Sequence, residues 1–191
     1  MVLYKGRLAM EMPLGNVLSQ VEGKHRADPP LHLWHPKLSG NIDIRIDRAG
    51  RWFHEGTEIK RKSMVKLFAS ILRREDDGDY YLLTPAEKWR ISVEFMPLMV
   101  VAAEFENTGS NTSQVIHIRT NTDKLLTIGQ EHQLEMQKIE DGEYVPTIGI
   151  IHGLSALVTR SVYYQLAEVC VRGEGNSYGL YSGGCYFPLD F

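Results

Sequence analysis

The feature that most constrains the fold of this chain is an internal repeat with a spacing of 98 residues. Shifting the stretch from Ile42 to Val93 by that amount, without a gap, places Ser63 on Ser161 and Arg74 on Arg172. The same shift pairs His54 with His152, Thr57 with Ser155, Ala69 with Ala167, Tyr80 with Tyr178 and Leu82 with Leu180. The identities are sparse, but both stretches read as strand, turn, capped helix, glycine turn, strand, turn and strand. Such a repeat predicts two related domains side by side, with a cleft or packed seam between them.

Hydrophobic periodicity assigns the elements of the first repeat. Asn41–Ile46 alternates polar and apolar residues, as a half-buried strand does, and Arg51–Glu55 is expected to be the returning strand. From Met64 to Leu72 the apolar residues fall on one helical stripe, with Ser63 as the expected N-cap. Arg73-Arg74 suits the negative end of that helix dipole. Two further strands are predicted at Asp79–Leu83 and around Trp89, Ile91 and Val93.

Strand signals dominate from Pro97 onward. Strands are expected at Leu98–Phe105, Val115–Arg119, Lys124–Ile128, 132–138 and Val145–Ile151, followed by a helix over Ser161–Val171 and two short strands around Ser182-Gly183-Gly184. The predicted fold is α+β, with two tandem related domains that are each a curved antiparallel sheet with one packing helix, the C-terminal one being β-rich. We predict an N-terminal appendage at 1–28 and domains at 29–97 and 98–191.

Composition and charge restrict the classes of function. Hydrophobic and charged fractions of 43% and 24% are those of an ordinary globular protein. A formal net charge of −3 argues against a partner that is a nucleic-acid polymer. The start of the chain lacks a signal-peptide core, and no apolar run approaches the roughly 18 residues of a membrane span. With no export signal, Cys170 and Cys185 are expected to be reduced, so we predict a cytoplasmic protein that does not enter the membrane.

Both predicted helices begin beside positively charged residues. Lys60-Arg61-Lys62 directly precedes Ser63, and Arg160, the equivalent of Lys62, precedes Ser161. Cations at a helix N-terminus oppose the helix dipole, at a cost of roughly a few tenths of a kcal/mol each. A bound phosphate or carboxylate that accepts hydrogen bonds from the helix start would explain them. The alternative is that these long side chains simply extend into solvent.

His54-Glu55 has three interpretations. It is a proton-transfer pair, or His54 contacts a ligand, or His54 is a structural residue bonded to a nearby turn. No nucleophile accompanies the pair, because the chain has no Gly-x-Ser-x-Gly motif and neither cysteine lies in an activated motif. We therefore predict no catalytic residue and place His54 among the candidate ligand contacts.

Lys88 and Arg90 lie on one face of a predicted strand, with Trp89 on the other face. The pair can grip a phosphate or a carboxylate, or it can be a solvated strand face over a core that includes Trp89. Tyr163-Tyr164 can stack on a ligand or pack in the core.

Two other motifs carry little functional weight. His32-x-x-His35 has no identifiable third metal ligand, and Ser182-Gly183-Gly184 lacks the lysine of a phosphate-binding loop, so it is expected to be a turn. We predict no metal site and no cofactor.

Several long runs of residues resemble a known bacterial family. They are Pro30-Leu31-His32-Leu33-Trp34-His35-Pro36, Trp52-Phe53-His54-Glu55-Gly56-Thr57, Leu72-Arg73-Arg74-Glu75, the run from Asp77 to Ile91, Arg160-Ser161-Val162-Tyr163-Tyr164 and Ser182-Gly183-Gly184-Cys185-Tyr186-Phe187-Pro188-Leu189. Over about residues 29–189 the chain resembles domain of unknown function family 1285. The resemblance implies a duplicated core, a C-terminal domain superficially like the pleckstrin-homology fold, a nucleotide-like ligand at the domain interface and a role in signalling. It implies no catalytic residues.

The favoured function is a non-enzymatic binding or regulatory module that takes a small anionic or nucleotide-like ligand at the interdomain seam. The predicted ligand contacts are His54, Lys62, Lys88, Arg90, Arg160 and Tyr164. Two alternatives remain open. A protein–protein adaptor would use the same surface for a peptide or a partner domain. A hydrolase or transferase would use His54 and Glu55 and needs a nucleophile or a metal near them, and a pocket that joins them to Ser182 or Cys185 would favour it.

Overall fold

The computed structural model describes residues 29–139, 141–173 and 177–189. The predicted appendage at 1–28 lies outside these residues. The chain divides into two compact units, each considered below by itself. The first unit runs to Arg45 and resumes over Trp52–Ser92, and the second combines Ile46–Arg51 with the chain from Val93 onward.

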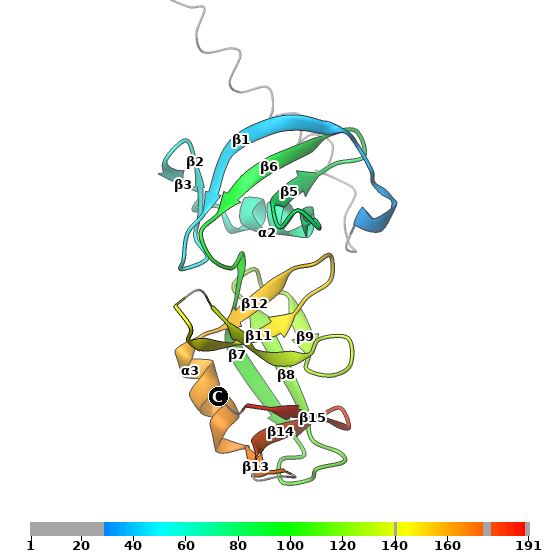
Figure 1. Cartoon of the computed structure of the whole chain (residues 1–191), viewed down its shortest axis with the longest axis vertical. Coiled ribbons are helices and arrows are strands. Elements are labelled where there is room, and N and C mark those ends of the chain that lie inside the picture. The colour runs from blue at the N-terminus through cyan, green and yellow to red at the C-terminus, as the bar shows by residue number, and fades with distance from the viewer. Residues whose placement is uncertain (1–28, 140, 174–176, 190–191) are drawn as a thin grey trace, which may run out of the picture. The chain divides into compact units, whose positions relative to one another are not determined.

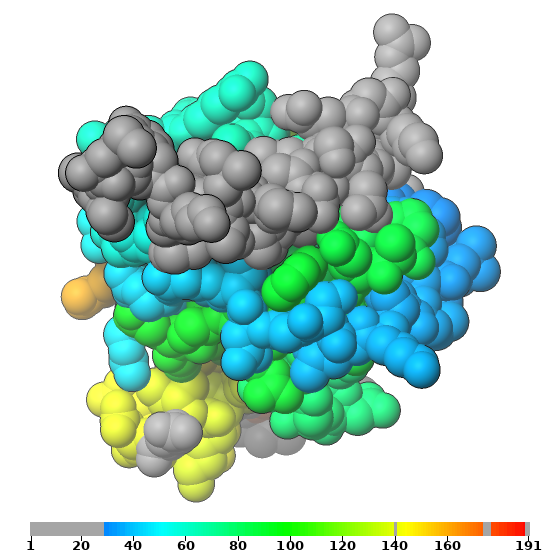
Figure 2. Space-filling model, turned by 90° about the horizontal axis from the view of Figure 1, so that it is seen from above, coloured from blue at the N-terminus to red at the C-terminus, as the bar shows by residue number. Residues whose placement is uncertain are grey.

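The first unit is built on a six-stranded sheet with one α-helix on its face (Figure 1). Its elements are the 3-10 turn η1 (Leu31–Leu33), β1 (Leu38–Ile46), β2 (Trp52–His54), β3 (Thr57–Glu58), α2 (Lys62–Ser70), β4 (Leu72–Arg74), β5 (Tyr80–Leu83) and β6 (Lys88–Val93). The strand order is β3-β2-β1-β6-β5-β4. In Figure 2 the blue residues of β1 lie beside the green residues of β6, as this order requires.

The core of the first unit follows from the alternation seen in the sequence. Ile44 and Ile46 of β1 are buried, and α2 buries Phe68. The ring of Phe68 stacks on that of Trp52 with 6.1 Å between centroids. Trp52 is therefore a core residue that joins the helix to the sheet.

The second unit contains two sheets and one α-helix. Its elements are β7 (Leu98–Glu106), β8 (Val115–Thr120), β9 (Leu125–Thr127), β10 (Leu134–Lys138), β11 (Tyr144–Gly149), β12 (Ser155–Val158), α3 (Arg160–Glu168), β13 (Val171–Arg172), β14 (Tyr178–Ser182) and β15 (Cys185–Pro188). The six-stranded sheet has the order β10-β11-β12-β7-β8-β9, and a three-stranded sheet has the order β13-β14-β15. β12 pairs with β7 in parallel, so the larger sheet is mixed and not antiparallel throughout.

The structure confirms the duplicated α+β architecture, and it shows where the repeat is in register. A shift of 98 residues carries α2, from Lys62 to Ser70, onto α3, from Arg160 to Glu168. The same shift carries the pairing of Arg74 with Tyr80 onto that of Arg172 with Tyr178. It also carries the pairing of Leu82 with Trp89 onto that of Leu180 with Phe187. The helix and the three strands after it thus repeat residue for residue.

The hairpins that precede the two helices do not follow this shift. The first turns through Glu55 and Gly56, with φ of 49° and 74°, and the second through His152 and Gly153, with φ of 64° and 72°. Positive φ at both central residues is the geometry of a tight hairpin turn. His54 precedes its turn whereas His152 lies within its own, so the two histidines matched in sequence are not structurally equivalent.

Both helices begin and end earlier than the sequence pattern predicted. Ser63 is not the N-cap, because α2 begins at Lys62 with Arg61 as its N-cap residue. Arg73 and Arg74 do not lie at the helix end, because they belong to β4. None of the described helices has the length and apolar character needed to cross a membrane. Cys170 and Cys185 are both free thiols.

A buried serine hydroxyl joins the two sheets of the second unit. Ser182, which is fully buried, donates from its Oγ to the carbonyl of Ile128 at 2.7 Å and accepts from the backbone N–H of Ile116 at 3.0 Å. Gln114 adds a third link, from its Nε2 to the carbonyl of Tyr181 at 2.7 Å. The Ser182-Gly183-Gly184 motif is the expected turn, with φ of 58° and 77° at its glycines, and its serine is a structural residue.

Two glycines near the end of the chain make room for an aromatic ring. A Cβ atom on Gly173 would lie 2.3 Å from the hydroxyl oxygen of Tyr186, and one on Gly179 would lie 2.6 Å from Cζ of the same ring. The ring of Tyr186 also lies 5.0 Å from that of Tyr181. The small sheet is therefore stabilised by an aromatic side chain lying across positions without side chains.

We predict that Ser182→Ala lowers the free energy of unfolding by about 1–3 kcal/mol, because it leaves the buried N–H of Ile116 and carbonyl of Ile128 without their partner. Urea denaturation measures this loss. Ser113→Ala, at an exposed serine of the same unit, is the control and should change the free energy of unfolding by less than about 0.5 kcal/mol. Equal effects of the two substitutions would contradict the structural role of Ser182.

Candidate functional site

The first helix starts without a side-chain cap and among exposed cations. Arg61, its N-cap residue, is extended, and no side chain of the described residues caps the free amides of the first turn. Ser63 instead accepts a hydrogen bond from Nε of Arg61 at 3.2 Å. Lys60, Arg61 and Lys62 are all exposed. Free amides and positive side chains at one helix end form the kind of surface that an anion binds.

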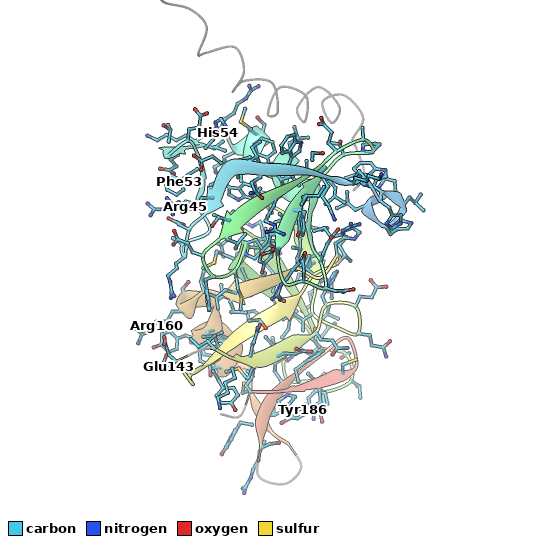
Figure 3. The ribbon with its side chains drawn as sticks, turned by 45° about the horizontal axis from the view of Figure 1, so that its top comes forward. Arg45, Phe53, His54, Glu143, Arg160 and Tyr186 are labelled. Carbon is cyan, nitrogen blue, oxygen red and sulfur yellow. The ribbon has the colours of Figure 1, made fainter. Side chains whose placement is uncertain are left out.

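The second helix starts in the same way. Its N-cap residue, Thr159, makes no capping bond, and its hydroxyl donates instead to the carbonyl of Val100 at 2.8 Å. Arg160, labelled in Figure 3, is the first residue of α3. Its Nε donates to the hydroxyl of Tyr164 at 2.9 Å, and its Cζ lies 5.6 Å from the centre of that ring. The structure thus brings together two predicted ligand contacts, Arg160 and Tyr164.

Lys88 and Arg90 lie on one strand face, as the sequence predicted. Both approach the ring of the buried Tyr81, with Lys88 Nζ at 4.7 Å and Arg90 Cζ at 5.7 Å from its centre. Each also has a carboxylate partner. Lys88 Nζ lies 2.7 Å from Oε2 of Glu75, and Arg90 Nε lies 3.2 Å from Oδ2 of Asp79.

Arg73 completes this network from the neighbouring strand β4. It pairs with Glu75 and donates from Nη1 to the carbonyls of Leu31 and Trp34, both at 3.2 Å. Arg73 therefore holds the segment around η1 against the sheet. The strand face is a network of paired charges and not a solvated set of cations.

The pKa values of this network reflect its contacts. Partial burial would raise the pKa of Glu75, but hydrogen bonds from Lys88 and Arg73, together with their charges, outweigh it and hold that pKa below its usual value. The hydroxyl of Tyr81 donates to Asp77 at 2.6 Å. That bond and burial raise the pKa of Tyr81, although Arg90 opposes the shift. The same bond holds the pKa of Asp77 low.

His54 lies at the end of β2, half-buried and paired with Thr57 across the hairpin. Figure 3 shows it beside Phe53, whose ring centre lies 4.3 Å from Cζ of Arg45. Within the described part of the chain, no hydrogen bond or ion pair joins His54 or Lys62 to Lys88 or Arg90. The predicted contacts of the first unit therefore do not form one bonded cluster.

Sequence reasoning missed a pocket of about 600 Å³ in the second unit. Its lining includes His117, His132 and two glutamates, Glu104 and Glu131. Alternation along Val115–Arg119 is the signal that places His117 on the outer face of its strand. The approach of the loop that carries His132 depends on tertiary structure and has no such signal.

Two family models match the chain. One, described as "Domain of unknown function (DUF1285), N-terminal domain", matches residues 29–96. The other, described as "Protein of unknown function (DUF1285), C-terminal domain", matches residues 97–189. No protein with a curated description matches the chain.

Two crystal structures are similar to the chain. A DUF1285 family protein from Silicibacter pomeroyi DSS-3 is 37% identical with a TM-score of 0.81, over 91% of this chain and 93% of that chain. A DUF1285 family protein from Shewanella baltica OS155 is 30% identical with a TM-score of 0.50, over 65% of this chain and 90% of that chain.

We predict that Glu75→Gln destabilises the first unit by about 1–3 kcal/mol near neutral pH, because Arg73 and Lys88 lose their shared counter-charge in a partly buried site. The lowered pKa of Glu75 determines how its contribution to the free energy of unfolding changes with pH. Its ionised form stabilises the fold above about pH 4.5, its ordinary pKa, and this contribution is lost as the pH falls through the lower folded pKa.

Urea denaturation of both proteins between about pH 7 and pH 3 measures the effect. The difference between the native protein and Glu75→Gln should shrink as the pH falls below about 4.5. Glu58→Gln, at an exposed glutamate of the same sheet, serves as the control. A difference that stayed constant over the whole range would rule out the proposed ion pairing.

Proposed function

The chain belongs to the DUF1285 family, and we propose that it is a non-enzymatic ligand-binding or regulatory module. The ligand is a small anion, such as a nucleotide, and the role is in signalling in the cytoplasm. The two starts of helices α2 and α3 are the binding surfaces, with Lys62 and Arg160 as the cationic contacts.

The observation that carries the proposal is the repetition of an unfavourable arrangement. Lys62 and Arg160 each occupy the first position of a nine-residue helix, and they are related by the 98-residue shift. Neither helix has an acidic residue in its first turn or a side-chain cap. A cation there opposes the helix dipole, whereas a bound anion turns the same arrangement into a stabilising one.

The second helix start adds an aromatic surface. Tyr164 is 53% exposed, and its hydroxyl accepts the hydrogen bond from Arg160, so the guanidinium and the ring are held together. A ligand with an anionic group and a planar ring matches this pair, because the anion pairs with the guanidinium while the ring stacks on tyrosine. This match is the reason to prefer a nucleotide over a simple inorganic anion.

Lys88 and Arg90 remain predicted ligand contacts, but their positive charges are already partly neutralised by neighbouring carboxylates. Glu75 already accepts a hydrogen bond from Lys88 and Asp79 forms an ion pair with Arg90, so an anion would have to compete with these carboxylates. Lys62 and Arg160 have no such carboxylate partner among the described residues. The weight of the proposal therefore rests on the helix starts.

We predict that saturating nucleotide or phosphate raises the melting temperature of the full chain. Ligand at about 100 times its Kd stabilises the fold by about 2.7 kcal/mol, which is roughly 5–10 °C for a protein of this size. Thermal-shift assays should show that Lys62→Ala combined with Arg160→Ala abolishes the rise. The same substitutions should slightly stabilise the ligand-free protein, because they remove the opposition to the helix dipoles.

Lys37→Ala combined with Arg172→Ala is the matched control, since both residues are exposed and the change in net charge is the same. This control should keep the ligand-induced rise. If only one of the two single variants, Lys62→Ala or Arg160→Ala, loses the ligand-induced rise in melting temperature, the site is at the start of the helix that carries that residue. A rise that persists in the double variant at Lys62 and Arg160 overturns the proposal.

A further inference from the structure

The missed pocket of the second unit lies on the outer side of β8 and β9, which are side by side in Figure 1. Its volume of about 600 Å³ is within the range of small-molecule sites. One wall is β9 and the loop that follows it, and Gly183 closes one side. The pocket belongs wholly to the second unit and does not include Lys62, Arg160 or Tyr164.

Strand alternation builds the polar wall of this pocket. Ile116 and Ile118 of β8 are buried, which turns His117 to the outer face. Strand register places Glu104 of β7 and Thr127 of β9 on either side of His117. Nδ1 of His117 lies 2.9 Å from the hydroxyl oxygen of Thr127, so this row is held together by a side-chain hydrogen bond.

The loop after β9 adds a histidine with a defined tautomer. Nδ1 of His132 lies 2.9 Å from the carbonyl oxygen of Gly149. A carbonyl only accepts, so Nδ1 carries the proton, and in the neutral ring Nε2 is left as a hydrogen-bond acceptor. His132 is half-buried and lines the pocket, so its ring adds acceptor character there.

The charged carboxylate side chains that line the pocket are not matched by lysine or arginine. Glu104 and Glu131 line the pocket, and no lysine or arginine is among its lining residues. Arg119 lies on the same face of β8, two residues from His117 and opposite Leu125 of β9, but it is not among the lining residues. The pocket therefore favours a cation over an anion, which is the opposite of the preference proposed for the helix starts.

The cation that fits is organic. No three His, Cys, Asp or Glu side chains of the described chain are placed to share a metal ion. The pocket also has an aliphatic part, Leu125, which lies on the same face of the sheet as His117 and is 71% exposed. A large aliphatic side chain this exposed beside two carboxylates matches a ligand with both an apolar body and a positive group.

We propose that this pocket binds a small aliphatic amine. The ammonium group is attracted by the charge of Glu104 and Glu131, and it donates a hydrogen bond to one of the acceptors that line the pocket, namely these two carboxylates and Nε2 of His132. The alkyl part covers Leu125. This site is independent of the anion-binding proposal, so either one can fail without the other.

Titration of the full chain with butylamine, followed by amide NMR spectra, tests the site. Saturable shifts are expected at residues 125–132 and Gly183. Butan-1-ol has the same apolar body without the charge and should bind several-fold more weakly, and butanoate should not bind. Equal binding of butylamine and butan-1-ol, or tighter binding of butanoate, overturns the proposal.

Charge-neutralising variants supply the second arm. Glu104→Gln and Glu131→Gln should each weaken butylamine binding by about two- to fivefold, the range expected for solvent-exposed ion pairs. Both residues are exposed, so the fold should persist, and the amide spectra check this. Glu168→Gln, an exposed glutamate on α3, is the matched control and should bind as the native protein does. Native affinity in both pocket variants, or an equal loss in the control, overturns the proposal.

Discussion

Each unit depends on burying one short helix against a sheet. A nine-residue helix is marginal in isolation, so tertiary burial must hold α2 and α3 in place. In the first unit Phe68 stacks on Trp52, and in the second α3 buries Val162 and Leu166. Because this burial holds the helix, its first turn does not need a capping side chain. Both helix starts are thereby free to carry a cation at a position that an isolated helix would avoid.

Local patterns in the sequence were enough to predict the repeat and most of the elements, but not the short strands β3, β4, β12 and β13. The alternation of β1 and the apolar stripe around Phe68 both correspond to buried faces. The start of the first helix was predicted wrongly because Ser63 is a good N-cap by composition. In the structure Arg61 is the N-cap residue, two residues after Ile59, whose N–H donates to the carbonyl of Trp52 in the hairpin. The parallel pairing of β12 with β7 joins residues such as Leu98 and Ala156, and local periodicity carries no information about such distant partners.

The candidate site was predictable to the same extent. The shared face of Lys88 and Arg90 follows from strand alternation, and the structure confirms it. Their carboxylate partners, Glu75 and Asp79, lie in the turn between β4 and β5, and finding them requires the pairing of β5 with β6. The pocket lined by His132 required more still, because that histidine is oriented by the carbonyl of Gly149, 17 residues further along the chain.

The two repeats differ in the residues that stabilise their sheets but share the basic residue at the start of the helix. The 98-residue shift carries Arg73, Glu75 and Tyr81 of the charged network onto Val171, Gly173 and Gly179, and it carries Lys88 onto Tyr186. The second repeat thus replaces paired charges by an aromatic ring packed over glycines. Since each repeat solves the same packing problem differently, the network around Tyr81 is best explained as a means of stabilising its own sheet.

A basic first residue on an uncapped helix is retained in both repeats, although packing does not require it and the helix dipole disfavours it. Retention of a locally unfavourable feature through such divergence supports a role in binding over a role in folding.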